Sequence, residues 1–254
     1  MKLATDNISK SIKEYCKLLS LPVVADCYET EAENAVKTKS SYQEYLYKVL
    51  QNQIIVRMDN SINAKIKKAK FPFIKTIEEF DFSFQPSIDE KLIRELANLN
   101  FLSHAKNIIF VGPPGVGKTH LSVAIGIKVA KARKRVLFFT AEELINQLIS
   151  AELSKKLPTY IDSLSRIDLL IIDELGYLEI GKHAASLFFK LISKRYEKTS
   201  TIVTTNKPFD EWGDIFGDEV VAAAILDRLL HHSYPFLIQG KSYRVKELFD
   251  KKQK

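Results

Sequence analysis

The chain has 254 residues, of which 46% are hydrophobic and 27% are charged, and its formal net charge is +7. This length buries one sizeable core with room for a smaller module, and the basic excess indicates an anionic partner such as nucleic acid. Cys16 and Cys27 are the only cysteines, which excludes a disulfide framework and fits a reducing cytosol. Because no apolar run has the length of a signal-peptide core or a membrane span, we expect a cytoplasmic protein with no membrane partner.

The N-terminal region is predicted to be all-helical. Its apolar residues recur at helical spacing, with a break at Pro22, and Ser41 and Glu44 form a capping box ahead of a long helical pattern. The aromatic segment "FPFIKTIEEFDFSFQP", residues 71–86, reads as the connector to the remainder of the chain. We therefore predict a small helical N-terminal domain, residues 1–75, followed by a second domain, residues 76–254.

The second domain alternates between helices and short apolar strands. Helices are expected at residues 88–99, 118–131, 141–153, 183–198, 218–232 and 242–252. Strands are expected at residues 107–112, 135–140, 167–174, 200–206 and 234–239. Thr140 and Glu143 supply a second capping box. Strands separated by helices of this length predict an α/β fold, a five-stranded parallel sheet with helices on both faces.

The stretch "GPPGVGKT" matches the phosphate-binding pattern G-x-x-x-x-G-K-[ST] in full, between a predicted strand and a predicted helix. Its glycines let backbone N–H groups approach a bound phosphate, and the following helix adds its positive N-terminal end. Lys118 is expected to reach the β- and γ-phosphates, and Thr119 to coordinate Mg²⁺. The residues predicted to bind the nucleotide are Gly112, Pro113, Pro114, Gly115, Val116, Gly117, Lys118, Thr119 and His120.

Two acidic residues end the third predicted strand, at the edge of the sheet where ligands bind in open α/β folds. Asp173 is suited to hold the water shell of Mg²⁺, and Glu174 to orient an attacking water. A kinase directs the phosphoryl group to a bound acceptor instead, so the acidic pair favours hydrolysis. The alternative is a strand that merely ends in solvated acids.

Three further side chains complete the predicted site. Asn206 follows the fourth strand, where its amide is able to hold the attacking water or simply to form a turn. Arg228, near the end of a helix, is a candidate arginine finger for a neighbouring subunit or a surface arginine at a helix end. Arg244 is a candidate contact to the γ-phosphate or a solvated arginine of the last helix.

These features occur in the order seen in the AAA+ P-loop ATPases of the initiator and helicase-loader group, which the sequence resembles. The stretches "LLIIDELGYL", "TTNKPFDEWGDIFGD", "ILDRLLHH" and "GKSYRVKE" are more similar still to the IstB family, the ATP-binding helpers of insertion-sequence transposition. The resemblance covers roughly residues 40–250. It implies an ATP- and Mg²⁺-dependent ATPase that forms homo-oligomers on double-stranded DNA, recruits a transposase and so assists DNA recombination.

The resemblance also assigns roles to single residues. It implies that Asp173 and Glu174 are the Walker B pair, Asn206 the first sensor, Arg228 the finger and Arg244 the second sensor. The stretch after Asn206 is too short for a full helical lid, so we expect a reduced or absent C-terminal lid. Two rival functions remain, a replicative helicase loader with the same ATPase core and a small-molecule P-loop kinase.

Charge is concentrated at the end of the N-terminal region. Residues 1–75 contain 13 Lys and Arg against 8 Asp and Glu, so they supply +5 of the net +7. Within them a short basic stripe is expected to contact DNA phosphates, and its members are Lys65, Lys67, Lys68 and Lys70. The alternative is a solvated helix terminus that favours cations. The stretch "KVAKARKR" is a second basic surface.

Overall fold

The computed structural model describes the chain except for residues 1, 178, 244 and 246–254, and except for the side chains of residues 2–6. The chain divides into two compact units, residues 1–64 and 65–254. The sequence-based boundary at residue 75 lies further along the chain. The larger unit begins earlier because Ala69 and Ile77, on either side of that boundary region, are both buried in the core of the sheet-containing unit.

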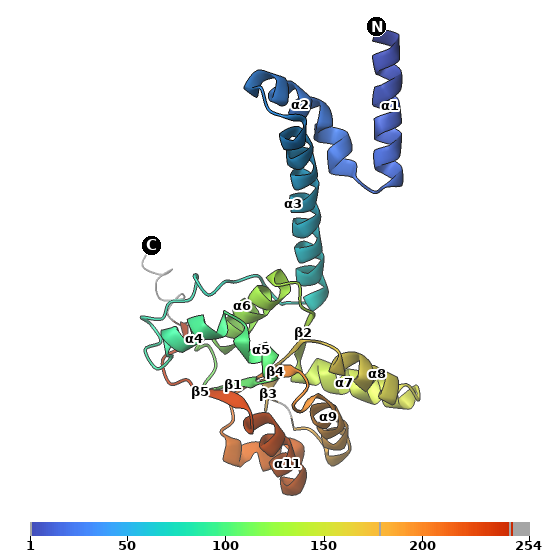
Figure 1. Cartoon of the computed structure of the whole chain (residues 1–254). Coiled ribbons are helices and arrows are strands. Elements are labelled where there is room, and N and C mark those ends of the chain that lie inside the picture. The colour runs from blue at the N-terminus through green and yellow to red at the C-terminus, as the bar shows by residue number, and fades with distance from the viewer. Residues whose placement is uncertain (1, 178, 244, 246–254) are drawn as a thin grey trace. The chain divides into compact units, whose positions relative to one another are not determined.

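The first unit is built from helices. They are α1 (Lys2–Leu18), α2 (Pro22–Thr38) and the first part of α3 (Tyr42–Ala69) (Figure 1). Pro22 stands in the first turn of α2, where its missing N–H costs no hydrogen bond. The capping box at the start of α3 is confirmed, because the Ser41 N–H donates to Glu44 Oε2 at 2.7 Å and the Glu44 N–H donates to Ser41 Oγ at 3.2 Å.

The second unit alternates strands and helices. Its strands are β1 (Asn107–Val111), β2 (Val136–Thr140), β3 (Leu169–Leu175), β4 (Ser200–Thr205) and β5 (Ser233–Leu237). Its helices include α4 (Glu90–Leu96), α5 (Asn100–Ser103), α6 (Lys118–Lys131), α7 (Ala141–Leu153), α8 (Leu157–Ser165), α9 (Lys182–Arg195), α10 (Trp212–Phe216) and α11 (Glu219–Leu230). A 3-10 turn, η1 (Phe209–Glu211), precedes α10. The second capping box is confirmed, since Thr140 Oγ1 accepts from the Glu143 N–H at 3.1 Å.

The five strands form one parallel sheet in the order β2-β3-β4-β1-β5, as the alternating pattern predicts. The strand ahead of the glycine-rich loop, β1, lies between β4 and β5. Because all strands run the same way, the ends of β1, β3 and β4 meet at one edge. That edge carries the loop, the acidic pair and Asn206.

Helices cover both faces of the sheet (Figure 1). On one face, α4, α5 and α6 pack through apolar residues such as Ile93, Phe101 and Leu121. On the other face, α7 to α11 pack through residues such as Leu144 and Phe188. The strands contribute to both cores, which explains why β1 is buried at every position.

The sequence did not predict α8, and it predicted one helix that the structure does not describe in full. Helix α8 is short and has a proline at its second position. The helix predicted at residues 242–252 falls mostly outside the described residues, so it stays a prediction. Across the described part of the chain, no helix combines the length and apolar character needed to cross a bilayer.

Candidate functional site

The loop between β1 and α6 has the geometry of a phosphate cradle. Gly115 and Gly117 have φ angles of 80° and 99°, in the left-handed region that favours glycine. A Cβ atom on Gly117 would lie 2.4 Å from Cε2 of Phe80, and one on Gly115 would lie 2.1 Å from Oγ of Ser242. Glycine therefore suits the backbone angles at these two positions and lets Phe80 and Ser242 approach the loop backbone closely.

Lys118 begins α6, and its side chain turns back over the loop. Its ammonium donates hydrogen bonds to the carbonyl oxygens of Gly112 at 2.6 Å and Pro113 at 2.8 Å. The residue is only 7% exposed, so its charge is held inside the cradle. A bound phosphate would offer this ammonium an anionic partner in place of the neutral carbonyls, and such a hydrogen bond is stronger.

A cavity of about 380 Å³ adjoins the loop, a size typical of small-ligand sites. Its lining residues are Phe73, Lys75, Glu79, Phe80, Asp81, Gln85, Pro114, Gly115, Val116, Gly117, Lys118, Thr119, His120, Glu174, Tyr177, Thr204 and Tyr243. The loop residues from Pro114 to His120 and Glu174 thus share one cavity. Gly112 and Pro113 contact it indirectly, through their carbonyl bonds to Lys118.

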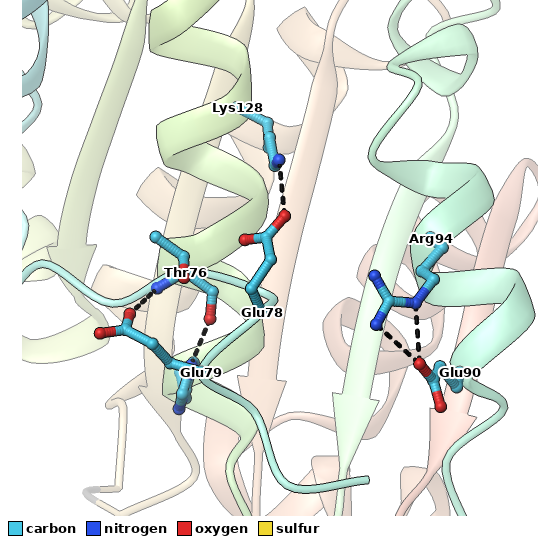
Figure 2. Close-up of polar contacts among 7 residues, drawn as sticks. Thr76, Glu78, Glu79, Glu90, Arg94 and Lys128 are labelled. Atoms are coloured by element: carbon cyan, nitrogen blue, oxygen red, sulfur yellow. Dashed lines mark hydrogen bonds and ion pairs between the residues drawn. The ribbon is translucent and has the colours of Figure 1, made fainter.

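The wall opposite the loop comes from the segment 73–85, which the sequence analysis treated only as a connector. Its Thr76 carbonyl accepts a hydrogen bond from Nε2 of His120 at 2.7 Å, and burial lowers the pKa of that histidine. Glu78 pairs with Lys128 of α6 at 3.0 Å, and this hydrogen bond lowers the pKa of Glu78 to about 2 (Figure 2). Figure 2 also shows the Thr76 N–H donating to Glu79. The contacts of Thr76 with His120 and of Glu78 with Lys128 hold this wall against the helix that follows the loop.

The acidic pair sits in a β-bulge. The β3–β4 register pairs Ile172 with Val203 and Leu175 with Thr205, so two residues of β3 face one residue of β4. Glu174 has a φ angle of 62°, which is unusual for a residue other than glycine and common at functional sites. The bulge exposes Glu174 in the cavity and leaves Asp173 buried at 3% exposure.

Hydroxyl groups surround the buried carboxylate. Thr119 Oγ1 lies 3.1 Å from Oδ1 and 3.0 Å from Oδ2 of Asp173, and Thr204 Oγ1 donates to Oδ1 at 2.5 Å. Burial raises the pKa of Asp173, and the two hydroxyl hydrogen bonds oppose this effect. The structure therefore joins the predicted metal ligands Thr119 and Asp173, and it adds Thr204, which sequence reasoning missed.

Asn206 follows β4 directly, beside the turn that continues from Glu174. Its Oδ1 atom lies 3.3 Å from where a Cβ on Gly176 would stand. Among the described residues this oxygen is buried and has no hydrogen-bond partner. Thr205 Oγ1 accepts from the Lys207 N–H at 3.0 Å and so fixes the turn around Asn206. Asn206 is not among the residues that line the cavity, so its contact with an attacking water stays a prediction.

Arg228 lies at the opposite edge of the sheet from the loop. The next residue, Leu229, accepts a hydrogen bond at 3.0 Å from Nδ2 of Asn107, the first residue of β1. The Arg228 guanidinium stacks on the ring of Phe189 at 4.6 Å and donates to the Ala224 carbonyl at 3.0 Å. Arg228 therefore does not line the cavity of its own chain.

The remaining predicted features are Arg244 and the basic stripe. Arg244 lies outside the described residues, so its role stays a prediction. The basic stripe lies at the C-terminal end of α3 and just beyond it, in the second unit. Lys67, Lys68 and Lys70 are exposed and Lys65 is half-buried, which leaves the stripe open to a phosphate backbone.

The residues present fit a magnesium–nucleotide complex. The loop supplies backbone N–H groups, Lys118 supplies a buried ammonium, and Asp173 supplies a buried carboxylate with hydroxyl neighbours. These are the groups that such a complex needs. Lys118 and the loop amides would hold the phosphates, and Thr119 and Asp173 would hold the metal. Fold and site together define a P-loop NTPase of the AAA+ class.

Comparison with known proteins identifies the family within this class. Residues 15–251 match the family model of the IstB-like ATP binding protein, and the chain belongs to this family. It is 48% identical over 219 residues to an ATP-binding protein of insertion sequence IS21 from Pseudomonas aeruginosa, covering 86% of this chain and 83% of that one. It is 45% identical over 249 residues to an insertion sequence IS5376 protein from Geobacillus stearothermophilus, covering 97% and 99% of the two chains.

Solved structures agree on the fold. The DnaC helicase loader is 27% identical, with a TM-score of 0.51 over 59% of this chain and 88% of that one. DnaA from Aquifex aeolicus bound to AMPPCP is 21% identical, with a TM-score of 0.57 over 72% of this chain and 56% of that one. The predicted AAA+ fold and the IstB-like family are thereby confirmed, and binding of ATP is supported by the family.

Proposed function

We propose that the chain is a Mg²⁺-dependent ATPase that assembles on double-stranded DNA and assists transposition by recruiting or stimulating a transposase. The observation that carries the catalytic part is the exposed Glu174, which lines the cavity, next to the buried Asp173, which accepts a hydrogen bond from Thr119 of the loop helix. The relatives named for insertion sequences support the biological part.

The chemistry divides among the residues of the site. Lys118 exchanges its loop carbonyl partners for phosphate oxygens, and the loop amides fix the phosphate chain. Glu174, which lines the cavity, orients a water and accepts its proton, and Asn206, which follows β4, is the proposed first sensor. Thr119 and Asp173 would hold Mg²⁺, and the ion would supply positive charge to balance the charge on the phosphates.

A replicative helicase loader is the second candidate. The likeness to the DnaC loader supports it, because both share the ATPase core. That likeness covers 59% of this chain at 27% identity, whereas the IS5376 relative covers 97% at 45% identity. Transposition is therefore the better supported role. A small-molecule kinase is less supported, because the acidic pair at the cavity suits a water nucleophile.

The test has two stages. Phosphate release by the purified chain is measured with ATP and Mg²⁺, with and without double-stranded DNA and with no other acceptor. Release that Glu174→Gln abolishes establishes hydrolysis, and release that requires an added small-molecule acceptor indicates a kinase. The second stage mixes the chain with the transposase of its own element or with a hexameric helicase. ATP-dependent capture of the helicase alone would overturn the transposition role.

A further inference from the structure

One residue of β4 faces both acids of the site. Because Ile172 pairs with Val203 and Leu175 pairs with Thr205, the only β4 residue between these pairs is Thr204. It is 1% exposed, and it stands opposite the two-residue bulge formed by the acidic pair. A bulge leaves its extra residue without a regular ladder partner, so a side chain is needed to fix it.

The Thr204 hydroxyl contacts both acidic residues. The Glu174 N–H donates to Thr204 Oγ1 at 3.0 Å, and Thr204 Oγ1 lies 2.5 Å from Oδ1 of Asp173. A threonine hydroxyl carries a single hydrogen. Since the oxygen accepts from the Glu174 N–H, its own hydrogen is available for the Asp173 carboxylate. One hydroxyl therefore ties the backbone of Glu174 to the side chain of Asp173.

The geometry points to Thr204 as a positioning residue of the ATPase, and we propose that it aims Glu174 at the attacking water. Glu174 holds a left-handed backbone conformation with a φ angle of 62° and an exposed side chain, so its direction depends on how its backbone is fixed. The hydrogen bond from the Glu174 N–H to Thr204 Oγ1 fixes that backbone. Because the same hydroxyl also contacts Asp173, it sets the position of the backbone relative to that carboxylate. This inference rests on the proposed hydrolysis of ATP.

The same strand supplies a matched comparison. Thr201 is also buried, at 2% exposure, and its hydroxyl accepts from Nε of Arg195 at 3.1 Å. Thr201 stands near the start of β4, away from the acids. Loss of its hydroxyl removes a buried hydrogen bond without touching the site, so it separates a structural effect from a positioning effect.

The experiment compares Thr204→Val, Thr204→Ser and Thr201→Val with the parent chain. Valine keeps the shape and removes the hydroxyl, whereas serine keeps the hydroxyl. We expect turnover in Thr204→Val to fall at least about tenfold, as expected when a general base is misdirected. Affinity for a fluorescent ATP analogue should change less than about threefold, because Lys118 and the loop amides hold the phosphates. Serine should restore turnover, and Thr201→Val should lower the unfolding temperature with turnover intact.

A second readout does not depend on hydrolysis. Hydrogen–deuterium exchange of the peptide containing Glu174 should accelerate in Thr204→Val and not in Thr204→Ser, because only valine removes the acceptor of that N–H. Unchanged exchange overturns the positioning role. So does turnover in Thr204→Val within twofold of the parent chain, or equal losses in the valine and serine variants. If the parent chain releases no phosphate while exchange behaves as expected, the proposed ATPase function fails and the structural link stands.

Discussion

The hydroxyl of Thr119 lies 3.0 Å from Oδ2 of Asp173, which joins the glycine-rich loop to the acidic strand end inside a buried pocket. Residues 54 positions apart in the sequence thus share one polar cluster. Burial raises the pKa of Asp173, and the hydrogen bonds from Thr204 and Thr119 and the charge of Lys118 do not outweigh that effect. A raised pKa means that the ionised form of this carboxyl is less favourable in the folded chain than in water.

We predict that Asp173→Asn stabilises the metal-free protein. A carboxyl whose folded pKa is raised contributes stability below its unfolded pKa, and this contribution is lost as pH rises through the folded pKa. At neutral pH the asparagine removes that cost and still accepts from Thr204. Thermal unfolding at pH 7 should shift upward, by about 2–4 °C for each kcal/mol gained.

The same variant should lose Mg²⁺-dependent tightening of ATP binding, because an amide is a poorer ligand for this hard cation. Titration of a fluorescent ATP analogue with and without Mg²⁺ measures this loss. A lower unfolding temperature of the variant at pH 7, together with retained Mg²⁺ dependence, would show that the Asp173 carboxylate neither destabilises the fold nor binds the metal.

Glu174→Gln is predicted to bind ATP and fail to hydrolyse it. Glutamine has the same size and keeps the backbone N–H that bonds to Thr204, so the bulge is retained. It lacks the carboxylate that accepts a proton from water. Phosphate release should drop at least about a hundredfold, while the complex with ATP and DNA lives longer. Hydrolysis at the parent rate would exclude Glu174 as the water-orienting residue.

The parts of the site that the sequence predicts are those whose residues lie close together along the chain. The glycine loop, Lys118 and Thr119 are contiguous in the sequence, so a motif and its flanking elements were enough to assemble the cradle. Both capping boxes were also read correctly, because they involve residues three apart. Predicting these features requires no knowledge of the order of the strands in the sheet.

Other parts depend on which strands are neighbours. Thr204 faces the acidic pair only because β4 lies beside β3 and the register shifts between them. A threonine in an apolar strand has no local signal for that role. The cavity wall at residues 73–85 was missed for a similar reason, since its contacts to His120 and Lys128 span more than 40 residues of sequence. An aromatic, proline-containing segment reads as a connector until its packing is known.

The basic stripe provides a graded prediction for DNA binding. Replacing Lys65, Lys67, Lys68 and Lys70 by Gln removes positive charge from an exposed helix end with no role in the cavity. Binding to double-stranded DNA should weaken, and the slope of log affinity against log salt should fall by roughly 0.9 for each lost phosphate contact. Phosphate release without DNA should be little altered.

A control for the stripe exists in the second basic stretch. Lys131, Arg133 and Lys134 are exposed at the end of α6 and the start of the next loop. Replacing these three by Gln changes a similar amount of charge at a different surface. If only this control set flattens the salt dependence, the DNA-binding surface lies at the end of α6 and the prediction for the stripe is wrong.

The last prediction is that a neighbouring subunit completes the site. Arg228 lies near the start of β1, whereas the glycine loop follows the end of that strand, so one chain does not bring them together. Arg228→Ala should therefore leave ATP binding by the monomer nearly unchanged. Hydrolysis on DNA should fall steeply, since arginine fingers contribute roughly 10³ or more in rate.

Mixing two inactive variants tests the shared site directly. Lys118→Ala lacks the cradle charge and Arg228→Ala lacks the finger, so each homogeneous assembly is inactive. A mixed assembly contains some interfaces with an intact cradle on one side and an intact finger on the other. Phosphate release should therefore return in the mixture with DNA present and peak at intermediate ratios. Phe189→Leu is a useful companion variant, because it removes the ring on which Arg228 rests while keeping the arginine itself. If mixed assemblies form on DNA and no ratio restores activity, Arg228 acts within its own chain or only supports the packing of α11 on α9.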